Sequence, residues 1–406
     1  MTYTRYRNRA SVAWIAGTPA VIVPVAAYNA YEINIDAEKS VNVPNTSTIG
    51  SDYYAPTDPA GRYQLPGFQV RLRGSGTDNV PPPEGTLFRA MGFTETANGI
   101  AFEYVLGNTH LATGSPAGST RPVDLELWTD RLYRKMDNCV LNGIFSFESN
   151  KFVTVDVTGR GQCVAARNGG IEIDALASFV AGVNPVPVQS EAGQVTLARS
   201  AEVTGSVTGA TSTTVLIDSA ALFFDNGIYP GDAIAMDVGL ETATVVTVDS
   251  QTQITSTALS GAGSYAAGEA YTITKANKTF TDLVIPRIIC DIGNVIDPRD
   301  DINGAHGFSQ AIITGRQPSY TVIVEAPSLH DGINFEYEFT QKSTFDWQWT
   351  HEAGLGVRRE VVSKFSGVMN DFPSQSVMNG KIVYALTFDQ AVESGDDPFT
   401  MTWKGA

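Results

Sequence analysis

Residues 125–162, LELWTDRLYRKMDNCVLNGIFSFESNKFVTVDVTGRGQ, decide the fold class of this chain. Three runs in or next to this stretch, 124–130, 145–148 and 152–158, alternate apolar with polar side chains. Alternation with a period of two puts one set of side chains in a core and the other on an open face of a sheet. Asn142-Gly143 lies between two of the runs and predicts a turn. The stretch therefore predicts antiparallel strands with one polar face.

The predicted polar face is rich in carboxylates. The candidates are Asp124, Glu126, Asp130, Glu148 and Asp156. They could form a solvated outer face, as on most antiparallel sheets. They could instead line a bore, where carboxylates would repel the phosphates of a passing nucleic acid. Such repulsion acts over about 8 Å at physiological salt and would work as a wall effect. Both interpretations stay open at this stage.

Length, charge and cysteine content narrow the class of protein. A chain of 406 residues predicts two or three domains. The formal net charge of -16 argues against a protein that grips nucleic acid, because Lys and Arg supply most of that affinity. Cys139, Cys163 and Cys290 are far apart, which predicts reduced, buried thiols and not a disulfide framework or a zinc site.

The N-terminal segment has some features of a secretory signal. Three arginines precede the apolar stretch 12–27, but Pro19 and Pro24 interrupt that stretch, so a cleaved signal is not expected. No stretch reaches the ~18 unbroken apolar residues of a membrane span, and no membrane association is expected.

Composition divides the chain into four segments. We expect an N-terminal arm and first strand in 1–40, one half of the main β-fold in 41–190 and the other half in 276–406. The segment 195–275 is rich in Thr, Ser, Ala, Val and Gly, and Arg199 is its only cation before Lys275. Its short apolar runs, separated by turn residues, predict an inserted all-β module. A long hairpin extension of the main sheet is the alternative.

Two loops and two short helices are expected within the main fold. Residues 44–66 are rich in Pro, Gly, Ser and Asp without periodicity, which predicts a long loop that has a use. Helices are expected over 82–91 and from Pro327 to about Phe339. A second loop is expected near 292–309. Candidate contact residues in the two loops are Asp52, Tyr53, Tyr54, Asp58, Arg62, Asp300 and Asp301.

The two halves share an order of elements: strand, basic-glycine turn, helix, then four strands. Arg73 matches Arg316, and residues 102–104 match 345–347 at the same spacing. Asn142-Gly143 matches Asn379-Gly380 after a short deletion. An ordered match of this kind is what a duplicated domain produces.

The sequence shows no catalytic, metal or cofactor constellation. The four histidines are scattered, and none has a partner at metal-ligand spacing. Residues 74–79 begin like a dinucleotide-binding loop but end in Asn79. Residues 297–304 hint at a calcium loop, but Arg299 stands where the first ligand would be. We therefore expect no cofactor and no enzymatic activity.

Several segments resemble the tube-building domain of major tail proteins from long, non-contractile-tailed bacteriophages. They are residues 72–76 (LRGSG), 81–92 (PPPEGTLFRAMG), 157–160 (VTGR), 297–304 (DPRDDING) and 312–316 (IITGR). Their order along the chain carries the resemblance, which covers most of 60–180 and 279–406. It implies a mainly β fold with short helices, a β-sandwich or barrel, here duplicated and carrying an inserted β module.

The resemblance also implies a function and partners. Proteins of this family polymerise into stacked rings that conduct DNA, so the expected location is the virion tail, after synthesis in the host cytoplasm. Six tube domains close a ring, so a duplicated chain would close it as a trimer with pseudo-six-fold symmetry; a hexamer is the alternative. Other expected partners are the tape measure, tail terminator and distal tail proteins, and DNA would pass without specific binding. A secreted adhesin-like β protein, or another virion component such as a decoration or distal tail protein, is the alternative function.

Overall fold

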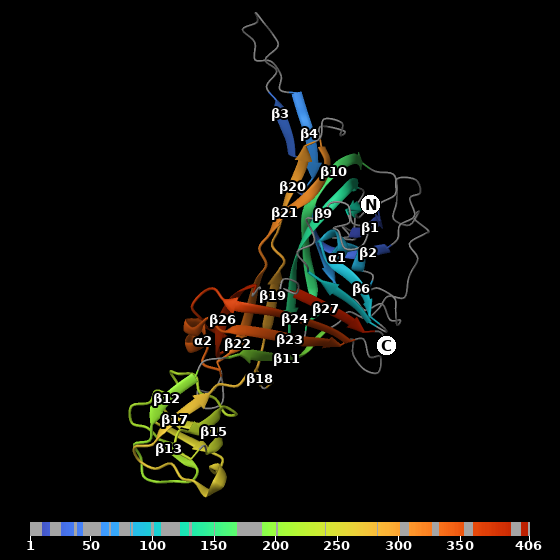
Figure 1. Cartoon of the computed structure of the whole chain (residues 1–406). Coiled ribbons are helices and arrows are strands. Elements are labelled where there is room, and N and C mark those ends of the chain that lie inside the picture. Colours follow the sequence, from blue (N-terminus) through green and yellow to red (C-terminus); the bar gives the residue numbers. More distant parts are fainter. Residues whose placement is uncertain are drawn as a thin grey trace, which may run out of the picture.

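The computed structural model has 27 strands and two α-helices in its described residues, which confirms the expected mainly β fold with short helices (Figure 1). The structure describes residues 10–16, 26–35, 39–43, 58–64, 66–72, 82, 84–98, 101–106, 122–129, 132–149, 151–168, 189–199, 202–239, 241–281, 283–300, 308–326, 333–352, 360–390 and 399–404. Nineteen of the described strands belong to one large antiparallel sheet, and β20 and β21 form a separate two-stranded sheet.

Six strands of the first half pair in a closed cycle, in the order β1, β2, β5, β10, β9, β8 and back to β1. Their bounds are Ala10–Ala16 (β1), Ala26–Ile35 (β2), Pro66–Arg71 (β5), Val123–Thr129 (β8), Leu132–Glu148 (β9) and Thr154–Asn168 (β10). Closure removes the unpaired edges of this part of the sheet. Residues 10–16, expected in an N-terminal arm, are therefore a strand of the closed unit.

The second half continues the same sheet as an open, curved layer. Its strands are β11 (Gln189–Ala198), β18 (Lys278–Phe280), β19 (Arg287–Asp291), β22 (Ser319–Glu325), β23 (Thr344–Glu352), β24 (Glu360–Met369), β25 (Ser374–Met378), β26 (Lys381–Gln390) and β27 (Phe399–Lys404). Strand β19 pairs with both β9 and β22. Strand β27 pairs with both β24 and β7 (Ala101–Val105), and β7 pairs with β6 (Thr94–Asn98). The two halves are thus joined through their sheets.

One hydrophobic core serves both halves. Its buried side chains come from the first half, such as Phe88 and Phe145, and from the second, such as Trp349 and Phe399. The helix α1 (Gly85–Ala90) lies in this core: Phe88 stacks with Trp403 of β27 at a centroid distance of 6.2 Å. The halves are therefore one folding unit, whatever their evolutionary relation.

The segment between β11 and β18 forms a separate unit with its own sheet and core (Figure 1). Its six strands are β12 (Glu202–Ser206), β13 (Val215–Ile217), β14 (Ala233–Met236), β15 (Thr242–Ser250), β16 (Gln253–Ser256) and β17 (Ala270–Thr274). A short 3-10 turn spans Ser260–Ala262. We call residues 202–274 the module. The expected start at residue 195 is too early, because Val195 and Leu197 belong to β11 and are buried in the main core.

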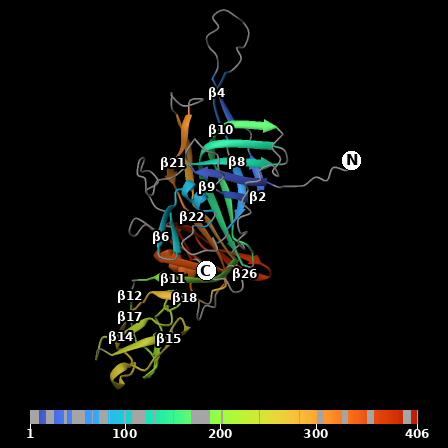
Figure 2. The same cartoon turned by 90° about the vertical axis from the view of Figure 1, so that its right-hand side faces the viewer.

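Two hairpins extend from the same end of the body, and the module lies at the other end (Figures 1 and 2). One consists of β3 (Lys39–Val43) and β4 (Asp58–Gln64), and the other of β20 (Asn294–Asp300) and β21 (Phe308–Arg316). The expected loop over 44–66 is thus shorter than predicted, because residues 58–64 are strand. In the expected loop near 292–309, residues 294–300 and 308–309 are likewise hairpin strand.

The alternation that predicted the sheet is confirmed, but the turn at Asn142-Gly143 is wrong. Phe145, Phe147, Val153 and Val155 are buried, whereas their neighbours Ser146, Thr154 and Asp156 are partly exposed. Asn142 and Gly143 lie inside β9, which runs unbroken to Glu148. Gly143 allows close packing, because a Cβ at this position would lie 2.9 Å from the Met91 sulfur. Asn379-Gly380, by contrast, does form the turn between β25 and β26, with positive φ at both residues.

The proposed repeat needs a different alignment. The helix α2 (Phe335–Gln341) begins later than the predicted Pro327. In each half, a residue with positive φ, Gly92 or Lys342, ends the helix two residues before the next strand. This shared feature aligns β6 with β23 in the repeat. Residues 102–104 lie in β7, so their predicted match with residues 345–347 of β23 is wrong. The common order of strand, helix and antiparallel hairpin remains.

The shared core makes a testable prediction. Phe399 contacts Phe93 and Phe145 of one half and Trp349 and Tyr320 of the other, with ring centroids 5.3 to 6.4 Å apart. We expect Phe399→Ala to lower the free energy of unfolding by about 3–5 kcal/mol, measured by urea denaturation. Val238→Ala is the control, because Val238 is 63% exposed. Equal effects of the two substitutions would contradict the shared core.

Candidate assembly surfaces and the module junction

The polar face of β9 and β10 carries charges of both signs. Glu148 accepts a hydrogen bond from Lys151 at 2.7 Å and lies directly across from Arg287 of β19. Asp156 accepts a hydrogen bond from the Gln69 amide at 2.8 Å. Arg71, Arg160 and Asp291 also point to this face, because their strand neighbours are buried on the other. The described part of the face is therefore mixed and does not form a wall of carboxylates.

The remaining acidic candidates lie in or near β8. Asp124 and Glu126 flank the buried Leu125, and in the pairing of β8 with β9 Glu126 stands opposite Lys135. Asp130 lies outside the described residues. The structure thus brings Glu148 and Asp156 onto one face, and β8 continues the same sheet.

Part of the polar face is covered by the β20–β21 hairpin. Val140 of β9, only 1% exposed, packs under Ile296, Ala311 and Ile313. The expected open face is thus closed where the hairpin leaves the body.

A polar cluster fixes the base of this hairpin. The Asn294 side chain donates to the carbonyl oxygens of Met91 (2.8 Å) and Leu141 (3.0 Å) and accepts from Arg316 Nε at 2.7 Å. Its backbone N–H donates to Asn142 Oδ1 at 2.9 Å. Hydrogen bonds to α1, β9 and β21 therefore set the direction in which the hairpin leaves the sheet.

The candidate contact residues of the two loops are partly placed. Asp58 and Arg62 lie in β4, and Asp300 ends β20. Asp52, Tyr53, Tyr54 and Asp301 lie outside the described residues. In the suspected calcium loop, Asp297 accepts from Thr314 Oγ1 at 2.7 Å and lies 3.8 Å from Arg160, so it already has partners within the protein.

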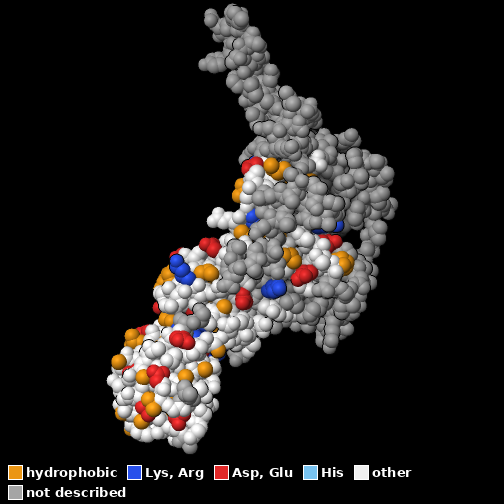
Figure 3. Space-filling view, in the orientation of Figure 1, with side chains coloured by type: hydrophobic (Ala, Val, Ile, Leu, Met, Phe, Trp, Pro, Cys, Tyr) orange, Lys and Arg blue, Asp and Glu red, His pale blue; other side chains and the backbone are white. Residues whose placement is uncertain are grey.

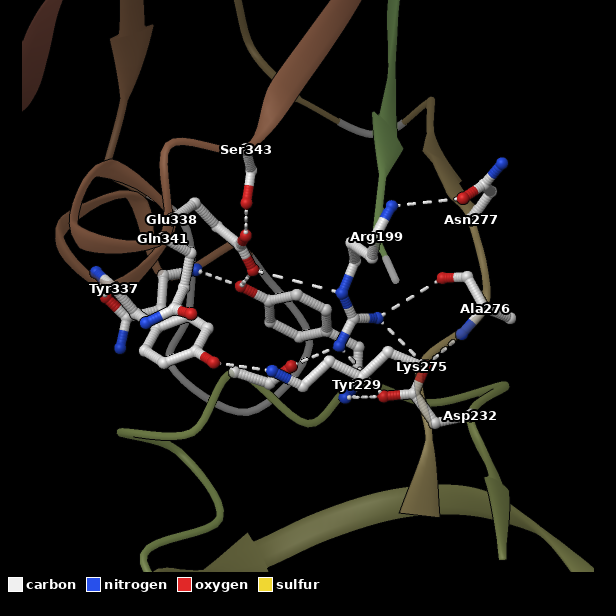
Figure 4. Close-up of polar contacts among 12 residues, drawn as sticks. Arg199, Tyr229, Asp232, Lys275, Ala276, Asn277, Tyr337, Glu338, Gln341 and Ser343 are labelled. Carbon is white, nitrogen blue, oxygen red and sulfur yellow. Dashed lines mark hydrogen bonds and ion pairs between the residues drawn. The ribbon is translucent and has the colours of Figure 1, made fainter. Parts of the chain in front are cut away.

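The module is fastened to α2 by a buried ionic cluster, which we call the junction (Figure 4). Arg199 has a side-chain exposure of 2% and forms a two-pronged ion pair with Asp232, with distances of 2.8 and 3.0 Å. Its Nε lies 3.9 Å from Glu338 Oε1, and its guanidinium stacks over the Tyr229 ring at 4.4 Å. Arg199 thus connects the end of β11 to both the module and α2.

Further contacts make the junction a two-sided interface. Tyr229 of the module donates to Glu338 Oε1 at 3.1 Å and accepts from the Asn334 N–H at 2.9 Å. Lys275 donates to the Tyr337 hydroxyl. Gly227 allows this close approach, because a Cβ there would lie 2.4 Å from the Tyr337 ring. These contacts restrict the orientation of the module relative to α2 more than its two chain connections, to β11 and β18, would do alone.

Burial dominates the electrostatics of the junction. It raises the pKa of the Glu338 carboxyl, although the Ser343 hydrogen bond and the Arg199 charge act in the opposite direction. It lowers the pKa of the Lys275 ammonium, and the Arg199 charge lowers that pKa further. A charged pair removed from water in this way is costly to break from one side, because the remaining charge loses its partner.

The junction was not predicted from the sequence. The one available signal was that Arg199 is the first of only two cations in a segment otherwise free of Lys and Arg. A lone cation among carboxylates indicates an ion pair, but its partner Glu338 is 139 residues away and no local pattern points to it.

Metal ligands and thiols were the other features to locate. No group of His, Cys, Asp or Glu among them could hold a metal ion. Cys139 and Cys290 are buried thiols, as expected, and the Cys163 side chain is not described. None of the helices in the described part of the chain has the length and apolarity needed to cross a membrane.

Comparison with protein-family models and with curated protein sequences gave no match for this chain. The proposed function therefore rests on the surfaces described above.

The junction predicts coupled unfolding of module and body. Arg199→Met removes the charge but keeps a long side chain, and it should lower the free energy of unfolding of the coupled unit by about 3–5 kcal/mol. All five tryptophans lie outside the module, so their fluorescence follows the body, whereas circular dichroism follows both parts. We expect coincident transitions in the wild type and separate transitions in Arg199→Met.

The matched control is Lys381→Met. Lys381 forms an ion pair with Glu325 at 2.7 Å, but its side chain is 62% exposed, so the loss should stay under about 1 kcal/mol. Coincident transitions in both variants would show that the junction does not couple the two parts.

Proposed function

We propose that this chain is a structural tail-tube protein of a long-tailed bacteriophage, which polymerises into stacked rings that conduct DNA. The observation that carries the proposal is that two hairpins distant in sequence, β3–β4 and β20–β21, leave the same end of the body (Figures 1 and 2). Residues 297–304 and 312–316, in or next to β20–β21, carry part of the resemblance. Projections on one end of a subunit suit contact with the next ring along an axis.

The placement of the module supports an exterior role for it. It lies at the end of the body opposite the hairpins and has its own core and sheet, so it adds no strand to the body sheet. Residues 202–274 contain eight Asp and Glu residues and no Lys or Arg, so about half of the net charge of -16 belongs to the module. An acidic unit without cations of its own suits a soluble outer surface.

The mixed charge of the β9–β10 face revises the expected bore. Fixed ion pairs such as Glu148 with Lys151 leave little net positive charge for phosphates to bind. A bore lined by this face would let DNA pass by being nearly neutral and not by being strongly repulsive. The ring would be a trimer with pseudo-six-fold symmetry or a hexamer, and it would meet tape measure, terminator and distal tail proteins in the virion.

Truncation of one hairpin tests the proposal. Replacing residues 299–307 by a two-residue turn keeps the Asn294 cluster and should give single rings or short stacks where the wild type gives tubes, seen by electron microscopy. The matched control replaces the module, residues 202–274, by a short Gly-Ser linker and should leave tube formation intact. Normal tubes from the truncated hairpin would refute its role in stacking.

Charge reversal tests which face lines the bore. If β8 and β9 line it, the combined change of Asp124, Glu126 and Glu148 to Lys should create a phosphate-binding wall and impair DNA delivery, with tube length unchanged. Infectivity and tube length are the two measurements. Unchanged delivery would place the face on the outside of the tube.

A further inference from the structure

Two strands of the body keep an unpaired edge in the described structure. The strand β25 pairs only with β26, and β6 pairs only with β7. The short β18 also pairs on one side, but the module covers it: Lys278 donates to the Pro230 carbonyl at 2.6 Å, and Tyr229 packs on Phe280. The other one-sided strand of this sheet, β3, belongs to the projecting hairpin. Among the described strands of the body, the edges of β6 and β25 are therefore the two places where the sheet could be continued.

The β25 edge lacks the features that normally prevent pairing with another chain. Proteins protect exposed edges with charges, prolines or bulges. None of the five residues Ser374–Met378 is charged or proline, and their pairing with β26 shows no bulge. Val377 and Ile382 stand opposite each other in the hairpin and are 73% and 56% exposed. This pair is an apolar surface next to a row of unpaired backbone groups.

The helix α2 supports this edge from within. Phe372, 52% exposed and two residues before β25, packs edge-to-face on Phe339 of α2 at 5.7 Å. Phe335 packs on Tyr384 of β26 at 5.8 Å, and the Gln375 amide donates to the Tyr384 hydroxyl at 3.0 Å. The edge is thus held in shape before any partner arrives, which lowers the entropic cost of binding.

The module shows the contrasting case. After β12, the N–H groups of Thr208 and Gly209 donate to the Ile217 carbonyl at 2.8 and 3.2 Å, which links the chain to β13. This link joins the two outermost strands of the module sheet. The outermost strands of the module sheet are therefore linked, whereas β6 and β25 of the body sheet keep open edges in the described structure.

We propose that the β25 edge of one copy pairs with the β6 edge of a second copy, as the lateral contact within a ring. Both strands have five residues, and β6 exposes Thr96 and Ala97 without a charge at either position. The edges lie on opposite sides of the body, as the positions of β6 and β26 show in both views (Figures 1 and 2). A contact between two different surfaces repeats from copy to copy and closes a ring when the rotation fits. The inference rests on the proposed function only in taking the product to be a ring.

The chemistry of a strand edge supports this choice of partner. The described part of the face shown in Figure 3 carries scattered acidic and basic side chains with isolated apolar ones between them. A strand edge needs a partner that supplies matching N–H and C=O groups at strand spacing, and charged surface side chains cannot do so. The open edge of an identical copy supplies these groups.

Cysteine cross-linking of the full chain tests the pairing. Ser376 and Thr96 are exposed residues at the centres of the two edges. The double variant Thr96→Cys, Ser376→Cys should form a ladder of disulfide-linked dimers, trimers and larger species under mild oxidation, whereas either single variant should stop at dimers. The control pair Thr96→Cys, Thr244→Cys uses an exposed module residue and should give no ladder.

A charged residue on the edge gives the second test. Val377→Lys should abolish ring formation at concentrations where the wild type is fully assembled, with thermal unfolding of the monomer unchanged. Val238→Lys, at a similarly exposed module position, should assemble normally. Two results together would overturn the edge pairing and leave the tube function standing. They are normal rings from Val377→Lys and no ladder from the Thr96→Cys, Ser376→Cys variant. A ladder made of open chains, without rings or tubes, would support the edge pairing and reject the tube function.

Discussion

The packing of the last strand, β27, against the first half of the chain is the constraint on which the rest of the structure depends. Phe399 and Trp403 of this strand contact aromatic side chains that lie hundreds of residues earlier. Because β27 also pairs with β24, the two halves share a core and cannot open as separate domains. The body is thus rigid enough to hold two projecting hairpins at one end and a module at the other.

The same rigidity reaches the module through charged groups, together with the packing of Tyr229 of the module on Phe280 of the body. At the junction, Arg199 and Glu338 lie almost fully out of water, and each depends on the other and on Asp232 and Tyr229. Buried ion pairs of this kind often contribute little net stability, but they demand one geometry. The junction therefore fixes the orientation of the module. Other residues of α2, Phe335 and Phe339, pack on Tyr384 and Phe372, so one short helix contacts both the module and the β25–β26 hairpin.

The acidic composition has a different meaning in the structure than in the sequence. As a single number, the net charge of -16 suggested a repulsive bore. The structure shows that carboxylates on the β9–β10 face have cationic or amide neighbours, and about half of the net charge comes from the eight carboxylates of the module. Cross-strand neighbours decide whether a carboxylate is compensated, and these neighbours, such as Arg287 for Glu148, are far apart along the chain. Composition alone cannot contain that information.

The sequence by itself determined the local structure: the mainly β class, the alternation around Phe145 and Val155, the two short helices and the turn at Asn379-Gly380. These depend on neighbours within a few residues, where period and turn chemistry act directly. Only the tertiary structure decided that Asn142-Gly143 continues a strand, where Met91 fills the space beside Gly143 and the Asn294 N–H bonds to Asn142. It also decided the junction partners, the shared core and which edges stay open. These features depend on contacts between segments distant in sequence, and such contacts overrule local turn preference once the chain is packed.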